Sequence, residues 1–203
     1  GFALSRLLYS RGAAVTVLLA GDKAKLTGAA ESNYRIVRQL PLEVLELDAA
    51  PVPALLGKLD FSSFNLVVDA LFGTGLSRNV EGRMASLVNA VNAANTPVLA
   101  LDIPSGTNAD TGEILGVGIH ADATVSFGIL KRGNLLYPGF RNGGVLYYSE
   151  ISFPPEVTGD DTLSVTLNIP PLPGQRDPAG HKGSFGKVLI IAGSTRYRGA
   201  PAL

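Results

Sequence analysis

The sequence predicts an α/β protein built as a three-layer αβα sandwich, with a Rossmann-like and mostly parallel sheet. Short apolar runs rich in β-branched residues alternate with stretches of helical periodicity along residues 1–150. Two of these runs stop at Asp69 and Asp102 and pass into glycine-containing turns. The two aspartates are 33 residues apart, the length of one right-handed βαβ crossover. We therefore expect both carboxylates at the same edge of one parallel sheet.

Composition narrows the class of protein. The chain has 203 residues, of which 46% are hydrophobic and 17% charged, as in folded globular proteins. Its 17 basic and 17 acidic residues cancel, so neither nucleic acid nor a membrane is expected as a partner. Cysteine is absent, which excludes disulfides, thiolate catalysis and sulfur-ligated metals. We expect a cytoplasmic protein, and the sequence leaves its assembly open, a homo-oligomer included.

The first elements resemble the second half of a βαβ unit. Residues 2–8 predict a helix with Leu4, Leu7 and Leu8 on one face, ending at Gly12, and residues 15–19 predict a strand. We expect the strand and loop that complete this unit to lie upstream of Gly1, so the chain is interpreted as N-terminally truncated.

The remaining elements follow from periodicity, prolines and glycines. Expected helices and strands are a helix over 27–40, an outer strand at 44–47, a short helix within 49–63, a strand at 66–68, a helix over 81–95, and strands at 98–101, 123–127 and 145–149. The last strand is expected at a sheet edge. Residues 154–178 are proline-rich and predict a connector, followed by a buried strand over 187–192 that opens a second α/β domain.

The aspartates and nearby hydroxyls allow two kinds of chemistry. Asp69, Asp102 and Ser105 could bind a hard cation through oxygen, or one carboxylate could act as a general acid or base. The loop at 73–78 could receive a phosphate through backbone amides and Arg78. Simpler interpretations remain open: Asp69 as a turn cap, Ser105 as a turn hydroxyl, and the pair Lys131 and Arg132 as a solvated loop pair.

Several separate motifs together give a more specific signal. They are Asp69-Ala70-Leu71-Phe72-Gly73-Thr74-Gly75-Leu76, Leu101-Asp102-Ile103-Pro104-Ser105-Gly106, Asp110-Thr111-Gly112, and Ala121-Asp122-Ala123-Thr124-Val125-Ser126-Phe127-Gly128 with Lys131. In this order they resemble the NAD(P)H-hydrate epimerase domain, the YjeF N-terminal domain family, over residues 1–155. The stretch from His181 to Pro201 is similar to the opening of an NAD(P)H-hydrate dehydratase domain.

The resemblance implies a metabolite-repair isomerase. Such an enzyme interconverts the R and S epimers of hydrated NADH or NADPH, so that a fused dehydratase (a lyase) can restore the cofactor. It implies a potassium ion held by Asp69 and Ser105, with an asparagine of the first loop as a further ligand. We expect Asp102 to be the catalytic group. The substrate-binding residues it implies, with Lys25 added as a further candidate, are Gly73, Thr74, Gly75, Leu76, Ser77, Arg78, Asn79, Asp102 and Lys25.

The resemblance also implies a domain organisation. Residues 1–155 would form the epimerase domain without its first strand and loop, 156–180 a proline-rich linker, and 181–203 a truncated start of the dehydratase domain. ADP or ATP would serve only the missing part of that dehydratase. Two alternatives remain: a non-catalytic nucleotide- or protein-binding module of the same fold, and a Rossmann dehydrogenase. The second is disfavoured because its glycine fingerprint is not seen.

Overall fold

A computed structural model describes residues 1–47, 57, 59–158, 162–163, 165–169, 178–181, 183–187 and 189–194 of the chain. The chain divides into two compact units, Gly1–Gly159 and Asp160–Leu203. The first unit is an α/β structure in which parallel strands alternate with helices, as predicted. Among the described residues, no helix is both long and apolar enough to span a membrane.

The first unit opens with a helix and a two-stranded sheet. Its elements are α1 (Phe2–Ser10), β1 (Thr16–Leu19), the 3-10 helix η1 (Lys23–Lys25), α2 (Gly28–Val37) and β2 (Glu43–Glu46). Strands β1 and β2 pair in parallel, with Thr16 opposite Glu43. The turn after α1 contains Gly12 at a φ of +87°, a conformation that glycine adopts at little cost.

One detail of α1 differs from the prediction. Leu7 is 46% exposed, while Ser5 is the buried residue of this helix. Ser5 can be buried because its hydroxyl donates to the carbonyl of Phe2 at 2.8 Å and so satisfies its own polarity within the helix. Apolar spacing alone therefore overestimated the burial of Leu7.

A four-stranded parallel sheet carries the rest of the unit. Its elements are η3 (Phe61–Ser63), β3 (Val67–Asp69), α4 (Gly82–Ala93), β4 (Val98–Leu101), β5 (Ala123–Phe127), η4 (Arg132–Asn134), α5 (Gly139–Asn142), β6 (Val145–Ser149) and α6 (Pro155–Thr158). The strand order is β3-β4-β5-β6, so β6 lies at an edge, as predicted. Much of the predicted helix within 49–63 falls outside the described residues.

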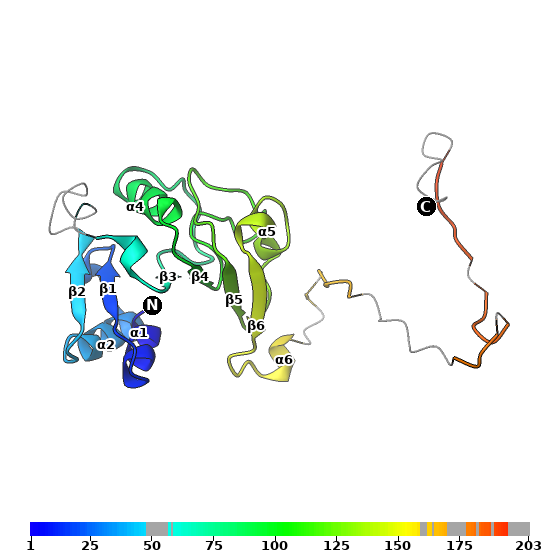
Figure 1. Cartoon of the computed structure of the whole chain (residues 1–203), viewed down its shortest axis with the longest axis horizontal. Coiled ribbons are helices and arrows are strands. Elements are labelled where there is room, and N and C mark those ends of the chain that lie inside the picture. Colours follow the sequence, from blue (N-terminus) through cyan, green and yellow to red (C-terminus); the bar gives the residue numbers. More distant parts are fainter. Residues whose placement is uncertain are drawn as a thin grey trace. The chain divides into compact units, whose positions relative to one another are not determined.

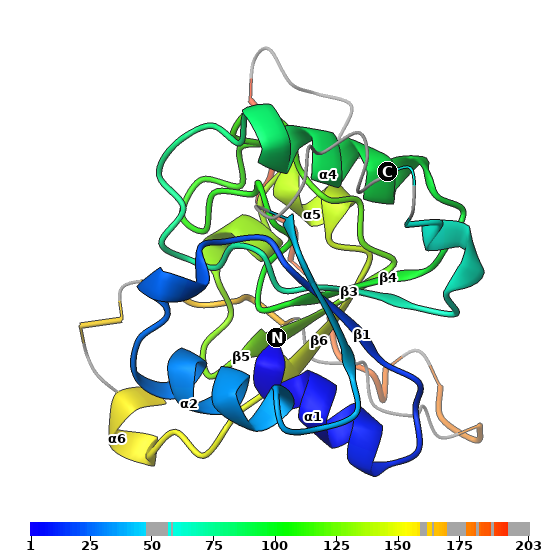
Figure 2. The same ribbon diagram turned by 90° about the vertical axis from the view of Figure 1, so that its left-hand side faces the viewer.

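Helices cover both sides of the strands. In Figure 2, α4 and α5 lie above the strands, while α1, α2 and α6 lie below them, which gives the expected three layers. Figure 1 shows the chain running in order from β1 and β2 through β3 and β4 to β5 and β6. The buried face of α4 carries Leu87, Val88 and Val91, which pack with Val98 and Ile119 in the main apolar cluster.

The second unit corrects one prediction. The stretch 187–192 forms no strand among its described residues, and Leu189, Ile190 and Ile191 are 83%, 68% and 90% exposed. A strand exists only through hydrogen bonds to a neighbouring strand, and no strand is found among the described residues of this unit. An apolar, β-branched run was therefore insufficient to predict strand structure here. The helix α6 takes up residues 156–158 of the expected linker.

Candidate active site

The carboxyl ends of β3 and β4 place the two aspartates at one edge of the sheet. Asp69 is the last residue of β3 and stands in register with Ala100 of β4, two residues before Asp102. Parallel strands present their carboxyl ends to the same crevice, the usual position of a ligand site in open α/β sheets. The two carboxylates nevertheless have different surroundings, because the chain turns differently after each strand.

Asp69 is buried against Ser105. The main-chain N–H of Ser105 donates to Asp69 Oδ2 at 2.7 Å, and the Ser105 hydroxyl donates to Oδ1 at 2.6 Å. The N–H of Leu71 donates to Oδ1 at 3.2 Å. Asp69 is 4% exposed and Ser105 is 1% exposed. Ser105 is thus a buried hydrogen-bond partner of a carboxylate. The simpler interpretation from its local sequence, a hydroxyl that only caps a turn, does not describe it fully.

Burial shapes the electrostatics of Asp69. Desolvation raises the pKa of its carboxyl above the ordinary value, and the hydrogen bonds from Ser105 and Leu71 oppose that rise. No basic side chain among the described residues forms an ion pair with it. The carboxylate thus has a hydroxyl beside it and no counter-ion among the described residues, and oxygen ligands of these kinds suit a hard cation. The carbonyl of Phe72 lies 3.4 Å from Ser105 Oγ and adds a further oxygen.

Asp102 has an unusual backbone. Its φ is +72°, in the left-handed region that L-amino acids other than Asn and Asp rarely adopt. The conformation is held from both sides: the N–H of Asp102 donates to the carbonyl of Val125 at 2.7 Å, and its own carbonyl accepts from Asn134 Nδ2 at 3.0 Å. Strain of this kind persists only where the surroundings enforce it, and it gathers at functional sites.

Lys131 reaches the side chain of Asp102. Its ammonium pairs with Asp102 Oδ1 and also donates to the carbonyl of Phe127 at 2.6 Å. The N–H of Phe127 donates to the same Oδ1 at 3.1 Å. Lys131 is therefore not the solvated loop residue that its sequence context favoured, whereas Arg132 is exposed.

Asn134 was missed by sequence reasoning. It is 4% exposed and lies at the end of η4, the short helix that follows Lys131. A polar residue just after a strand that neighbours β4 was the only available signal.

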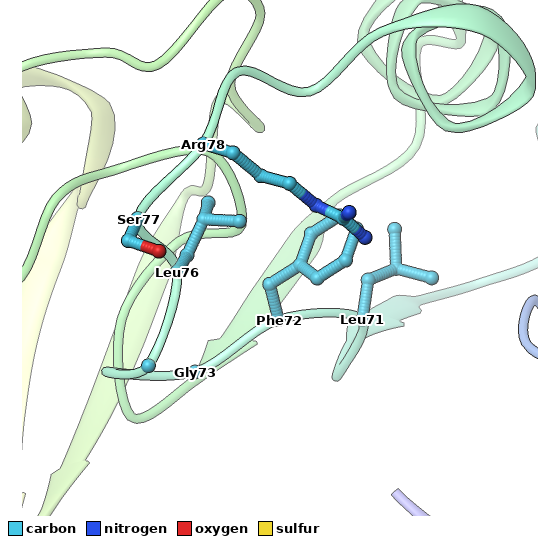
Figure 3. Close-up of a pocket in the computed structure, with 7 residues that line it drawn as sticks. Leu71, Phe72, Gly73, Leu76, Ser77 and Arg78 are labelled. Atoms are coloured by element: carbon cyan, nitrogen blue, oxygen red, sulfur yellow. The ribbon is translucent and has the colours of Figure 1, made fainter. Parts of the chain in front are cut away.

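The glycine loop after β3 lines a hollow of about 470 Å³. In Figure 3 the side chain of Arg78 extends back toward Leu71 and Phe72, while Ser77 points to another side of the loop. Seven residues line the hollow: Leu71, Phe72, Gly73, Gly75, Leu76, Ser77 and Arg78. Most of this loop is exposed, Thr74 and Asn79 included.

Lys25 has no bonded contact with the two aspartates in the described part of the chain. It is exposed at the end of η1, and no hydrogen bond or ion pair among the described residues joins it to Asp69, Asp102 or the glycine loop. The structure thus groups Asp69 with Ser105 and Asp102 with Lys131, and no described hydrogen bond or ion pair joins Lys25 to either pair.

A tight turn fixes Ser105. Gly106 follows it at a φ of +95°, and a Cβ there would lie 2.2 Å from the carbonyl oxygen of Val117. The carbonyl of Ser105 accepts from the N–H of Ile119, and that of Gly106 accepts from Leu115, both at 2.8 Å. Packing of the 114–119 segment against this turn therefore holds Ser105 over Asp69.

Comparison with known proteins identifies relatives along the whole chain. It is 47% identical over 204 residues to the bifunctional NAD(P)H-hydrate repair enzyme Nnr of Thermofilum pendens, a match covering 100% of this chain and 38% of that protein. It is 40% identical over 152 residues to the NAD(P)H-hydrate epimerase of Weissella koreensis, covering 74% of this chain and 64% of that protein. The chain thus spans well under half the length of the bifunctional relative.

A solved structure shares the fold. The crystal structure of the yeast protein YNL200c matches with a TM-score of 0.54 at 22% sequence identity, covering 66% of this chain and 54% of the yeast chain. The family model described as YjeF-related protein N-terminus matches residues 1–133, well over half of the sequence. The chain therefore belongs to the family of YjeF-related N-terminal domains.

Proposed function

We propose that this chain acts as an NAD(P)H-hydrate epimerase, interconverting the R and S epimers of hydrated NADH or NADPH. One observation carries the proposal: two carboxylates lie at one edge of the sheet. Asp69 is buried and bonded to Ser105, whereas Asp102 is partly exposed and paired with Lys131. Different surroundings allow two such carboxyls to take different roles. The curated relatives named epimerase and bifunctional repair enzyme support the choice of substrate.

Asp102 is the group that would exchange the proton. In the hydrated nicotinamide ring, the carbon that bears the hydroxyl is bonded to the ring nitrogen. The nitrogen lone pair forms the C=N bond as the C–O bond breaks, and the oxygen leaves as water with a proton from Asp102. Water then adds to the opposite face and returns one proton to the Asp102 carboxylate. The carbon centre is thereby inverted, with no net change in water or protons.

A potassium ion fits the surroundings of Asp69. The buried carboxylate lacks a basic partner among the described residues, and the Ser105 hydroxyl beside it and the Phe72 carbonyl beside that hydroxyl supply further oxygens. Asp69 and Ser105 would hold the ion, and no His, Cys, Asp or Glu cluster in the described part of the chain competes for it. When bound, the cation supplies positive charge that favours negatively charged or lone-pair-bearing groups of the substrate.

The loop from Gly73 to Asn79 would hold the substrate's phosphates. Exposed glycines let backbone N–H groups approach an anion, and Arg78 lines the same hollow with a cationic side chain. Exposed Lys25 would be a further cationic contact for the substrate.

We also propose that residues 181–203 belong to the start of a dehydratase part, joined through a linker over 156–180. The match to the bifunctional relative runs along the whole chain, which supports this assignment. We attribute no ADP or ATP binding to these residues.

Conversion of the purified R epimer of hydrated NADPH into its S epimer tests the proposal. The reaction is followed by chromatography in potassium buffer and in sodium buffer, against the spontaneous rate without protein. We expect acceleration, and a larger one in potassium. A folded protein that binds the hydrate without accelerating its conversion would instead be the binding module of the same fold.

A further inference from the structure

The carboxylate of Asp102 is held through one of its two oxygens. Both Lys131 Nζ and the N–H of Phe127 donate to Oδ1, whereas no described residue donates a hydrogen bond to Oδ2. The side chain of Asp102 is 24% exposed. Oδ2 is therefore the oxygen that remains available to a bound molecule.

Lys131 is itself fixed in place. Besides Asp102, its ammonium contacts the carbonyl of Phe127 at 2.6 Å, and its side chain is only 17% exposed. A lysine side chain has four rotatable bonds and rarely keeps one geometry in solvent. Two partners on one ammonium, with most of the stem covered, remove that freedom.

The same segment also grips the backbone of Asp102. Asn134, three residues after Lys131, donates to the Asp102 carbonyl at 3.0 Å. Residues 131–134 thus contact Asp102 at its side chain and at its strained main chain. A loop that was merely a solvated connection between two elements would require neither of these contacts.

We propose that Lys131 is a positioning residue for the epimerisation, which fixes Oδ1 of Asp102 so that Oδ2 exchanges the proton with the substrate. This inference rests on the proposed function. Lys131 gives up no proton in the step: the proton moves between Asp102 Oδ2 and the departing or entering water. Its ammonium stabilises the ionised carboxylate that exists between the two transfers.

The expected effect is on turnover more than on substrate binding. A misplaced acid–base group slows the chemical step, because proton transfer requires hydrogen-bond reach and correct alignment. Substrate phosphates would contact the glycine loop, which Lys131 does not touch in the described hydrogen bonds. Loss of Lys131 should therefore lower kcat and leave KM nearly unchanged.

Three variants test the proposal in the epimerisation assay. Lys131→Met removes the ammonium and keeps an unbranched side chain, and we expect kcat to fall by about 10- to 100-fold with KM within about threefold. Arg132→Met, a matched control, removes an exposed charge from the next residue and should behave as wild type. Lys131→Arg restores a cationic donor and should recover part of kcat.

Each failure has its own signature. Wild-type protein that does not accelerate the reaction would overturn the proposed function and this inference with it. Active wild type, with Lys131→Met as fast as Arg132→Met, would overturn the positioning role alone. A rise in KM at unchanged kcat would make Lys131 a substrate-binding group instead. Circular dichroism checks folding, and if Lys131→Met is unfolded, Lys131→Gln replaces it with the same expected loss of kcat.

Discussion

At the scale of single residues, Asp69 and Asp102 differ in what surrounds the charge. Asp69 is surrounded by hydrogen-bond donors from Ser105 and Leu71 and is almost fully buried. Asp102 is partly exposed beside an ammonium. The first surroundings suit a fixed ligand of a cation, and the second suit a group that meets a substrate. Substitution at each position should therefore change a different measurement.

Asp102→Asn should abolish most of the turnover while preserving the fold. Asparagine tolerates a positive φ and retains an acceptor for the Phe127 N–H, but it cannot carry the proton. We expect kcat to fall by about 100-fold or more. The free energy of unfolding should fall by no more than about 2 kcal/mol, as measured in urea. Near-normal turnover would rule out the proton role of Asp102.

Asp69 should give the stability of the protein a characteristic dependence on pH. Its folded-state pKa is raised by burial, so the native state binds this proton more tightly than the unfolded chain does. The stability it contributes is present below the unfolded pKa of about 3.9 and is lost as pH rises through the folded value. In potassium-free buffer, the wild type should therefore lose stability relative to Asp69→Asn as pH rises.

Urea unfolding between about pH 4 and about pH 8 measures this difference. The variant loses an acceptor for the Ser105 N–H, and this loss changes its free energy of unfolding by an amount that does not vary with pH. Other carboxyl groups titrate equally in both proteins and cancel in the comparison. Added potassium should restore wild-type stability near neutral pH and leave the variant unaffected. A difference that stays flat with pH would contradict the prediction.

At the scale of elements, the turn after β4 and the loop after β3 use glycine for opposite reasons. Gly106 is enclosed, and a Cβ there would meet the Val117 carbonyl oxygen at 2.2 Å. Gly73 is open, with nothing within 4 Å of an added Cβ. The first glycine permits close packing of two segments, and the second leaves room for a ligand.

Gly106→Ala should therefore destabilise the protein, and Gly73→Ala should not. We expect a loss of about 2 to 4 kcal/mol for Gly106→Ala, from the clash and the positive φ together. For Gly73→Ala we expect a change within about 0.5 kcal/mol but a higher KM, because the methyl group occupies the proposed phosphate site. Equal losses of stability would show that the loop after β3 is packed rather than open.

The helices and strands were largely predictable because their signals are local. The apolar face of α4 and the apolar runs in β3 and β4 identified these elements, and the two runs placed Asp69 at the end of β3 and Asp102 just after β4. The partners of those aspartates were less predictable. Lys131 contacts Asp102 because it follows β5, the neighbour of β4 in the sheet. A lysine in a solvated loop could have the same residues around it in the sequence, so the sequence alone does not distinguish the two cases. The exposed stretch 187–192 shows the converse, since an apolar run does not specify a pairing partner.

At the scale of the whole molecule, the strands differ in how many neighbours they have. Among the described strands, β4 and β5 have a partner on each side, whereas β1, β2, β3 and β6 each have one. Backbone amides open to solvent most easily where a strand is paired on one side only. The stability of the first unit should therefore be unevenly distributed along the chain.

Hydrogen exchange read by mass spectrometry should reveal this distribution. Peptides covering Val98–Leu101 and Ala123–Phe127 should exchange most slowly, and those covering Thr16–Leu19 and Glu43–Glu46 faster. Equal protection of β1 and β4 would mean that β1 has a second partner in solution.

The left-handed backbone at residue 102 has a consequence for how tolerant this position is to mutation. Asparagine adopts the same backbone conformation and keeps an acceptor for the Phe127 N–H, so the Asp102→Asn variant should accumulate in cells nearly as well as the wild type, whereas glycine relieves the strain but loses both that hydrogen bond and the contact with Lys131. A mutational scan scored by protein abundance would thus accept Asn at residue 102, while one scored by turnover would accept Asp alone. The divergence between the two scans would show that the carboxylate at this position matters more for the reaction than for folding.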